Sequence, residues 1–178
     1  MLRPEVCRTY HFATHGTSDN QYSAFLKTIQ LTGHQFSGEI PPSLYKSVSL
    51  QTIDFHSNAL QGSLSDAIGD LSQLIYFSAA NNKLGGTLPA SVSKLRQLTT
   101  LGLARNSFAG TIAPISDLPN LQILFLRYNL FEGAIPAVTN STAVFDMDHN
   151  QFDSIDPKLC AGEGILALQK SGGCDQDF

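Results

Sequence analysis

The sequence predicts an α/β repeat solenoid, because one pattern of apolar residues returns along the chain at steps of 21 to 24 residues. Within each unit two apolar residues alternate with a polar or small one, and an Asn and a further apolar residue follow. A period of this length is typical of coils whose units share one continuous core. The recurring Asn positions are Asn58, Asn82, Asn106, Asn129 and Asn150, with His34 at the same place in the first unit.

Each position of the unit has a predicted structural role. An alternating pair such as Ile53 and Phe55 predicts a short strand, because successive side chains of a strand point to opposite faces. The Asn is expected to bond backbone groups where the chain leaves the strand. The Gly four residues after it permits a tight return with positive φ. The apolar residues between the Asn and the Gly are expected to stack as a spine: Phe36, Leu60, Leu84, Phe108, Phe131 and Phe152.

Three units end on a more specific tail, which runs from Phe36 to Pro41, from Leu84 to Pro89 and from Phe131 to Pro136. This L/F-x-G-x-I/L-P tail with its 24-residue period resembles the plant-specific class of extracellular leucine-rich repeats. That class includes ectodomains of receptor-like kinases and receptor-like proteins, and polygalacturonase-inhibiting proteins. The resemblance implies a right-handed coil with a concave parallel β-sheet and a mostly irregular or 3-10 convex side. It also implies a non-catalytic module that recognises a protein or a peptide outside the cell.

The resemblance divides the chain into a partial N-terminal cap (1–25), six repeats (26–159) and a C-terminal cap (160–178). Ser65 and Ala113 replace the Pro of two units, and the sixth unit is shorter and lacks the Gly. Caps of this family usually hold a Cys pair and a Trp, whereas only Cys7 precedes the repeats here and the chain has no Trp. We therefore expect the natural start to lie upstream of Met1.

Cysteine and glycosylation signals fall outside the six repeats or at their junctions. Cys160 and Cys174 flank a Gly-rich stretch, which predicts a disulfide in the C-terminal cap; two reduced thiols in a cytosolic protein are the alternative. Cys7 then lacks a partner within the chain. Asn140 begins an Asn-Ser-Thr sequon and is a predicted glycosylation site. No ligand set with metal-site spacing accompanies Cys7, so we expect no metal and no cofactor.

Composition restricts the class of partner. The 178 residues carry a formal charge of -4, which makes generic binding to nucleic acid improbable. No apolar run approaches the roughly 20 residues that span a bilayer, so we expect no membrane insertion by this segment. Charged residues make up only 15%, which favours an extracellular or cell-surface location over a cytoplasmic one. The oligomeric state stays open.

The outward side chains of the predicted strands form a grid on the concave sheet, about 24 Å long for six strands. Phe125 stands out, because Leu124 and Leu126 already fill the inward positions. Aromatic and Arg side chains beside carboxylates are typical of interface hot spots. In the alternative interpretation Arg127 only pairs with Asp146 or Asp148, and Phe125 packs on a cap. The predicted partner-binding residues are Tyr76, Arg105, Ile123, Phe125, Arg127, Tyr128, Asp146, Asp148 and His149.

Three other functions compete with receptor-like recognition. Asp54, His56 and Ser57 suggest a catalytic triad, but their order on one strand provides no oxyanion donors, so no catalytic residue is expected. A secreted inhibitor of a cell-wall-degrading polygalacturonase is an alternative that the sequence cannot separate from a receptor fragment. An ice-binding protein is a third possibility, since Thr28, Thr52 and Thr100 share one column; Tyr76, Ile123 and Val144 interrupt it.

Overall fold

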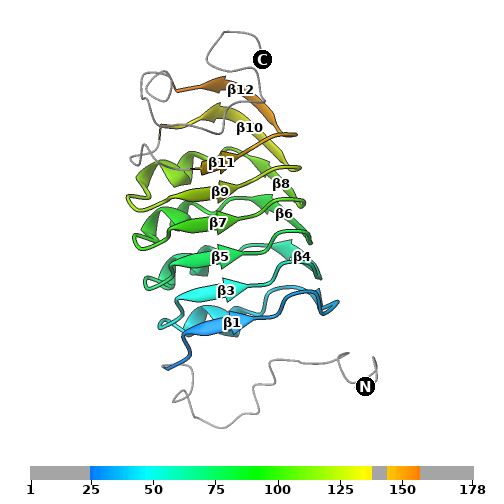
Figure 1. Cartoon of the computed structure of the whole chain (residues 1–178), viewed down its shortest axis with the longest axis vertical. Helices are drawn as coiled ribbons and strands as arrows, with labels where there is room; N and C mark the ends of the chain where they lie inside the picture. The colour runs from blue at the N-terminus through cyan, green and yellow to red at the C-terminus, as the bar shows by residue number, and fades with distance from the viewer. Residues whose placement is uncertain (1–24, 138–143, 157–178) are drawn as a thin grey trace.

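The computed structural model describes residues 25–137 and 144–156, and these form a coil of stacked units with two parallel sheets (Figure 1). Each unit passes through one strand of each sheet in turn. Strands therefore follow one another across each sheet in the order of the sequence. The predicted solenoid is confirmed.

The front sheet contains the first strand of each unit, and every strand is aligned with its neighbours without a shift. Ile29 lies opposite Ile53, Ile53 opposite Phe77, and Phe77 opposite Leu101. This constant register places equivalent residues of successive units side by side. Its strands are β1 (Thr28–Gln30), β3 (Thr52–Asp54), β5 (Tyr76–Ser78), β7 (Thr100–Gly102), β9 (Ile123–Phe125) and β11 (Val144–Asp146).

The back sheet contains the second strand of each unit. Between β10 and β12 its register shifts at Gly133 and Ala134, which accommodates the shorter sixth unit. The back strands are β2 (Ser37–Gly38), β4 (Ala59–Ser63), β6 (Lys83–Thr87), β8 (Ser107–Gly110), β10 (Leu130–Ile135) and β12 (Gln151–Ile155).

Short 3-10 helices connect the first four back strands to the next front strands, as the resemblance implied. Pro41 and Pro89 precede two of them in extended conformations. Ser65 stands where these units have Pro, and its hydroxyl accepts a 3.2 Å hydrogen bond from the Ala67 N–H. The helices are η2 (Pro42–Lys46), η3 (Asp66–Asp70), η4 (Ala90–Lys94) and η5 (Ala113–Asp117).

The recurring Asn side chains join neighbouring units, as predicted. Asn82 Nδ2 donates to the Phe55 carbonyl at 2.9 Å and to the Ala79 carbonyl at 3.0 Å. Asn82 Oδ1 accepts from the Leu60 N–H at 2.9 Å. Asn106, Asn129 and Asn150 repeat this arrangement. One amide thus satisfies backbone groups in two successive units, which fixes the turn after each front strand.

The core is one continuous apolar cluster between the two sheets and the 3-10 helices. The rings of Phe108 and Phe131 stack with centroids 6.0 Å apart, and Phe131 continues to Phe152 at 6.5 Å. The predicted spine is therefore present, with Leu60 and Leu84 at its earlier positions. The Gly after the spine residue has positive φ in five units, for example 82° at Gly62, as expected.

Several sequence predictions fall outside the described residues. These concern the proposed N-terminal cap up to residue 24, the C-terminal cap and the junction of the fifth and sixth units. Cys7, Cys160, Cys174 and Asn140 all lie there, so the disulfide and the glycosylation site stay predictions.

Candidate functional site

The exposed face of the front sheet varies from unit to unit, whereas the core beneath it repeats. The constant register aligns the residues between the two inward positions into one column. That column changes from polar to apolar and back to acidic along the coil: Gln30, Asp54, Ser78, Gly102, Phe125 and Asp146. A surface that changes while its scaffold repeats is the natural place for recognition.

A stack of aromatic and cationic side chains occupies the end of this face. The guanidinium carbon of Arg105 lies 4.5 Å from the centre of the Tyr128 ring, and that of Arg127 lies 4.8 Å from it. The ring of His149 packs against Tyr128 with centroids 4.1 Å apart. Both Arg distances are within the range of cation–π attraction. Four of the nine predicted partner-binding residues are thus brought into contact.

Apolar side chains adjoin this stack. Phe125, the last residue of β9, is 40% exposed, while Leu124 and Leu126 on either side of it are fully buried. Val144 on the neighbouring strand is 46% exposed, and Ile123 beside it is half-buried. We name these side chains together the arginine–aromatic patch: Arg105, Ile123, Phe125, Arg127, Tyr128, Val144, Asp146 and His149.

The ion pair predicted as an alternative role for Arg127 exists, but its geometry is weak. Arg127 Nη1 lies 3.9 Å from Asp146 Oδ2, and the two side chains are 40% and 35% exposed. A long, exposed pair of this kind contributes little to stability. Arg127 Nε is also shielded from solvent and has no hydrogen-bond partner among the described residues. Arg127 is therefore not held in its place by strong polar contacts.

The turn after each front strand has an unusual backbone conformation that sequence reasoning missed. Arg105, Tyr128 and His149 have φ near 56° to 57°, in the left-handed region that non-glycine residues seldom adopt. Ser57 and Asn81 share this conformation at the equivalent positions. Gly33, with φ of 71°, was the available signal in the first unit. These φ values set the directions in which the stacked side chains of the arginine–aromatic patch leave the backbone.

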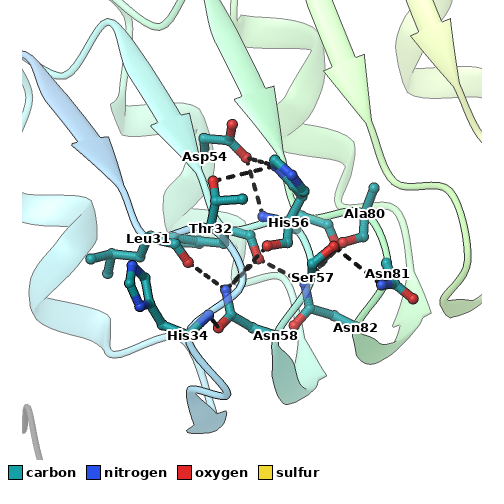
Figure 2. Close-up of polar contacts among 12 residues, drawn as sticks. Leu31, Thr32, His34, Asp54, His56, Ser57, Asn58, Ala80, Asn81 and Asn82 are labelled. Atoms are coloured by element: carbon teal, nitrogen blue, oxygen red, sulfur yellow. Dashed lines mark hydrogen bonds and ion pairs between the residues drawn. The ribbon is translucent and has the colours of Figure 1, made fainter. Parts of the chain in front are cut away.

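A polar cluster lies on the earlier half of the front sheet (Figure 2). His56 donates twice to Asp54 Oδ1, from its backbone N–H at 3.1 Å and from its ring Nδ1 at 2.8 Å. Thr32 Oγ1 lies 3.4 Å from the same ring nitrogen. We name Thr32, Asp54 and His56 the acidic cluster. Sequence reasoning placed Asp54 and His56 on one face but expected no site there.

The suspected triad is not assembled. The Ser57 hydroxyl accepts a 3.2 Å hydrogen bond from Asn81 Nδ2, whereas His56 bonds Asp54 (Figure 2). Ser57 also has φ of 59° in the turn, outside the strand that presents Asp54. Within 25–137 and 144–156, no group of three His, Cys, Asp or Glu side chains is placed to hold a metal ion.

The remaining predicted residues lie apart from the arginine–aromatic patch or contact it only through the backbone. Tyr76 is on β5, where its register neighbours are Thr52 and Thr100, so it is two strands away from Ile123. Asp148 accepts a backbone hydrogen bond from the Tyr128 N–H at 3.0 Å. Among the described ion pairs, Arg127 uses Asp146 and not Asp148.

A hollow of about 870 Å³ is present at the beginning of the coil, lined by core residues of the first two units such as Leu31, Phe36 and Leu60. It is the end face of the apolar core, next to the point where the undescribed residues 1–24 join the chain. Its position explains it without a ligand. In the described part of the chain no helix is long and apolar enough to cross a bilayer.

Comparisons with known proteins agree with this architecture. The family model described as Leucine Rich Repeat matches residues 49–71. No curated protein sequence matches the chain. The plant peptide hormone receptor RGFR1 in complex with RGF2 is similar in structure, with 31% identity and a TM-score of 0.70. The match covers 72% of this chain and 21% of that receptor chain.

Two further solved structures from Arabidopsis extend the comparison. The ectodomain of the receptor kinase HAESA, in complex with an N-terminally extended IDA peptide hormone ligand, has 32% identity and a TM-score of 0.66 over 72% of this chain and 22% of its own. A chain of the BIR3–SERK2 complex has 32% identity and a TM-score of 0.63 over 72% of this chain and 68% of its own. The present chain spans about a fifth of the peptide receptors that it resembles.

Proposed function

We propose that this chain, which belongs to the plant extracellular class of leucine-rich-repeat proteins, binds a peptide or a protein segment on the front sheet through the arginine–aromatic patch. The observation that carries this proposal is the exposure of Phe125 at the end of β9, between Leu124 and Leu126, which are both fully buried. A large apolar side chain exposed on a sheet has no role in the core below it. Partner binding gives it one.

The chemistry around Phe125 supports a protein ligand. Gly102 is the register neighbour of Phe125 on one side, so the aromatic ring adjoins a position without a side chain. On its other side, Asp146 and Arg127 offer a carboxylate and a guanidinium that engage each other only at 3.9 Å. An apolar centre with exchangeable charges at its border is the usual anatomy of a protein interface.

Similar proteins support the same class of ligand. The solved structures of RGFR1 and HAESA contain peptide hormones, and the BIR3–SERK2 structure is a complex between proteins. We infer a concave binding face, a role in ligand recognition rather than catalysis, and a location outside the cell or on its surface. The predicted disulfide and the glycan at Asn140 belong to the same proposal.

Selection of random peptides, displayed on phage, against the purified chain tests this function. For peptides selected on the natural sequence, Phe125→Ala and Arg127→Ala are each expected to weaken binding by more than about 1 kcal/mol, or roughly fivefold. The melting temperature should stay nearly unchanged, because both side chains lie outside the core. Gln61→Ala is the matched control, since Gln61 is exposed on β4 of the back sheet, away from the proposed binding face.

Normal binding by both patch variants would refute the patch as the binding site. A parallel assay of polygalacturonase activity separates the receptor-like function from the inhibitor. Inhibition of that enzyme that is lost in Phe125→Ala would keep the site but change the function to that of a secreted inhibitor.

A further inference from the structure

We propose that Asp54, supported by His56 and flanked by Tyr76, forms a second subsite on the front sheet that accepts a cationic side chain of the bound peptide. This inference rests on the proposed function and deepens it, because it names the chemistry of a second part of the ligand. It concerns a different half of the sheet from the arginine–aromatic patch.

The Asp54 carboxylate is held in a fixed position. Both hydrogen bonds from His56, at 3.1 Å and 2.8 Å, go to the same oxygen, Oδ1. The other oxygen points away from His56 in Figure 2. Two donors on one oxygen restrict the side chain to a single rotamer, so the second oxygen remains available for a ligand in a constant direction.

The same contacts leave the Asp54 carboxylate with lone pairs that can accept further hydrogen bonds. A carboxylate only accepts, so the 2.8 Å contact is a hydrogen bond donated by His56 Nδ1–H to Asp54. The His56 side chain is 42% exposed, so its ring lies beside the carboxylate at the surface of the sheet. The remaining lone pairs of the Asp54 carboxylate suit a ligand that brings several N–H donors, such as a guanidinium or an ammonium group.

No Lys or Arg side chain of the neighbouring strands competes for this carboxylate on the same face. Among the residues that face outward from β1, β3 and β5 and from the turns after them, Asp54 has the only formal charge; its neighbours in register are Gln30 and Ser78. The Asp54 side chain is only 13% exposed, so water screens it less than it screens a surface carboxylate. A cation brought to this position would therefore gain more than at an exposed Asp.

Tyr76 adds a second contact for such a cation. Ser78 lies opposite Asp54, and Tyr76 lies two residues before Ser78 on the same strand, so Tyr76 is the diagonal neighbour of Asp54. Diagonal neighbours in a sheet are roughly 7–8 Å apart, within reach of an aromatic ring. The ring of Tyr76 can pack on the methylene stem of Lys or Arg while the head group meets the carboxylate. This assignment gives Tyr76 a role that its distance from the arginine–aromatic patch had left open.

The register of the sheet sets the spacing between the two subsites. Asp54 on β3 and Phe125 on β9 belong to one column and are separated by three strand steps. Three steps correspond to about 14 Å, which an extended peptide covers in about four residues. The ligand is thus expected to carry a basic residue about four positions from the side chain that contacts Phe125.

Titration with a blocked amino acid tests the subsite independently of any peptide. The probe is Nα-acetyl-arginine N-methylamide, its neutral counterpart is the citrulline derivative, and NMR shifts of the labelled chain report binding. The arginine derivative is expected to shift the resonances of Asp54 and His56 in a saturable manner. The citrulline derivative is expected to bind with at least about tenfold lower affinity. Asp54→Asn should abolish the difference, because the amide still accepts from His56 but has lost the charge.

Asp70→Asn is the matched control, since Asp70 is exposed on η3 and away from the front sheet, and it should leave the arginine titration unchanged. Equal shifts with citrulline, or an unchanged titration in Asp54→Asn with a normal melting temperature, would overturn the proposal. A response of the same resonances to cellotetraose but not to arginine would also overturn it, in favour of a sugar site. If the peptide selection fails while the arginine titration gives the expected result, the Asp54 subsite is supported and the role of the arginine–aromatic patch is refuted.

Discussion

The two halves of the front sheet have the same backbone and different surfaces. Strands β1, β3 and β5 present mostly neutral polar side chains around the acidic cluster, whereas β7, β9 and β11 present the arginine–aromatic patch. Beneath both halves, Asn82 and Asn129 make equivalent bonds at nearly equal distances. The comparison shows that framework and surface are encoded at separate positions of each unit, so one can vary while the other is kept.

The largest expected change in the free energy of unfolding concerns the spine residues, because their burial differs between the two halves of the coil. Phe131 is fully buried between two other Phe rings, while Phe36 at the start of the coil is only half-buried. Phe131→Ala is expected to lower the free energy of unfolding by about 3–5 kcal/mol, through lost burial and the cavity left behind. Urea denaturation measures this loss. Phe36→Ala is the matched control and should lower the free energy of unfolding clearly less. An equal loss would contradict the tighter packing of the spine around Phe131.

The recurring Asn side chains that join neighbouring units predict an effect that is the same in both halves. Asn82→Ala and Asn129→Ala should each reduce the free energy of unfolding by about 1–3 kcal/mol, because each leaves buried backbone groups without partners. Denaturant unfolding of the two variants checks the prediction. Asn81→Gly provides the control, since the exposed Asn81 side chain bonds only the Ser57 hydroxyl, and Gly keeps the positive φ that Gly33 has at the equivalent position. A large loss in only one half would show that the framework is not equivalent along the coil.

The smallest expected effect is the loss of stability when Tyr45 ionises, and this residue lies only in the first half of the coil, on η2. Burial raises the pKa of Tyr45 above its usual 10.0, and the hydrogen bond from the Ser65 backbone partly opposes that shift. A raised pKa in the folded chain means that the contribution of Tyr45 to the free energy of unfolding is constant below about pH 10 and is lost as the pH rises above it. The equivalent positions of the next units are Gly69, Ser93 and Ser116, which do not titrate.

Melting curves between pH 8 and pH 11 measure this alkaline loss. The variant Tyr45→Phe keeps the buried ring and should remove the Tyr45 contribution to the loss. A variant that loses as much stability at pH 11 as the natural chain would show that other groups cause it.

The fold was readable from the sequence because its signal repeats. Asn82 could be assigned to a buried turn since the same residue returns at Asn106 and Asn129 with the same neighbours. Alternation around Leu124 and Leu126 likewise placed Phe125 outside the core. Each of these predictions relies on the repeat, because equivalent positions of successive units have the same backbone conformation and the same neighbours.

The contacts of the sites were not readable in the same way. The stacking of Arg105 and Arg127 on Tyr128 depends on left-handed turns, which are set by hydrogen bonds between units. The only signal of these turns in the sequence is Gly33. The pairing of Asp54 with His56 depends on rotamers, which a single sequence does not specify. Side chains that occur once give no repeat from which to infer their neighbours.

Because the front strands are aligned without a shift, the number of units between two sites fixes the distance between them. Inserting one whole unit between β5 and β7 would move the two subsites apart by one further strand spacing, about 4.8 Å, and would alter neither of them. Ligand length could then be selected separately from ligand chemistry, by duplication or loss of a unit. A family built in this way can change the distance between its contact points in fixed increments while every contact point stays intact.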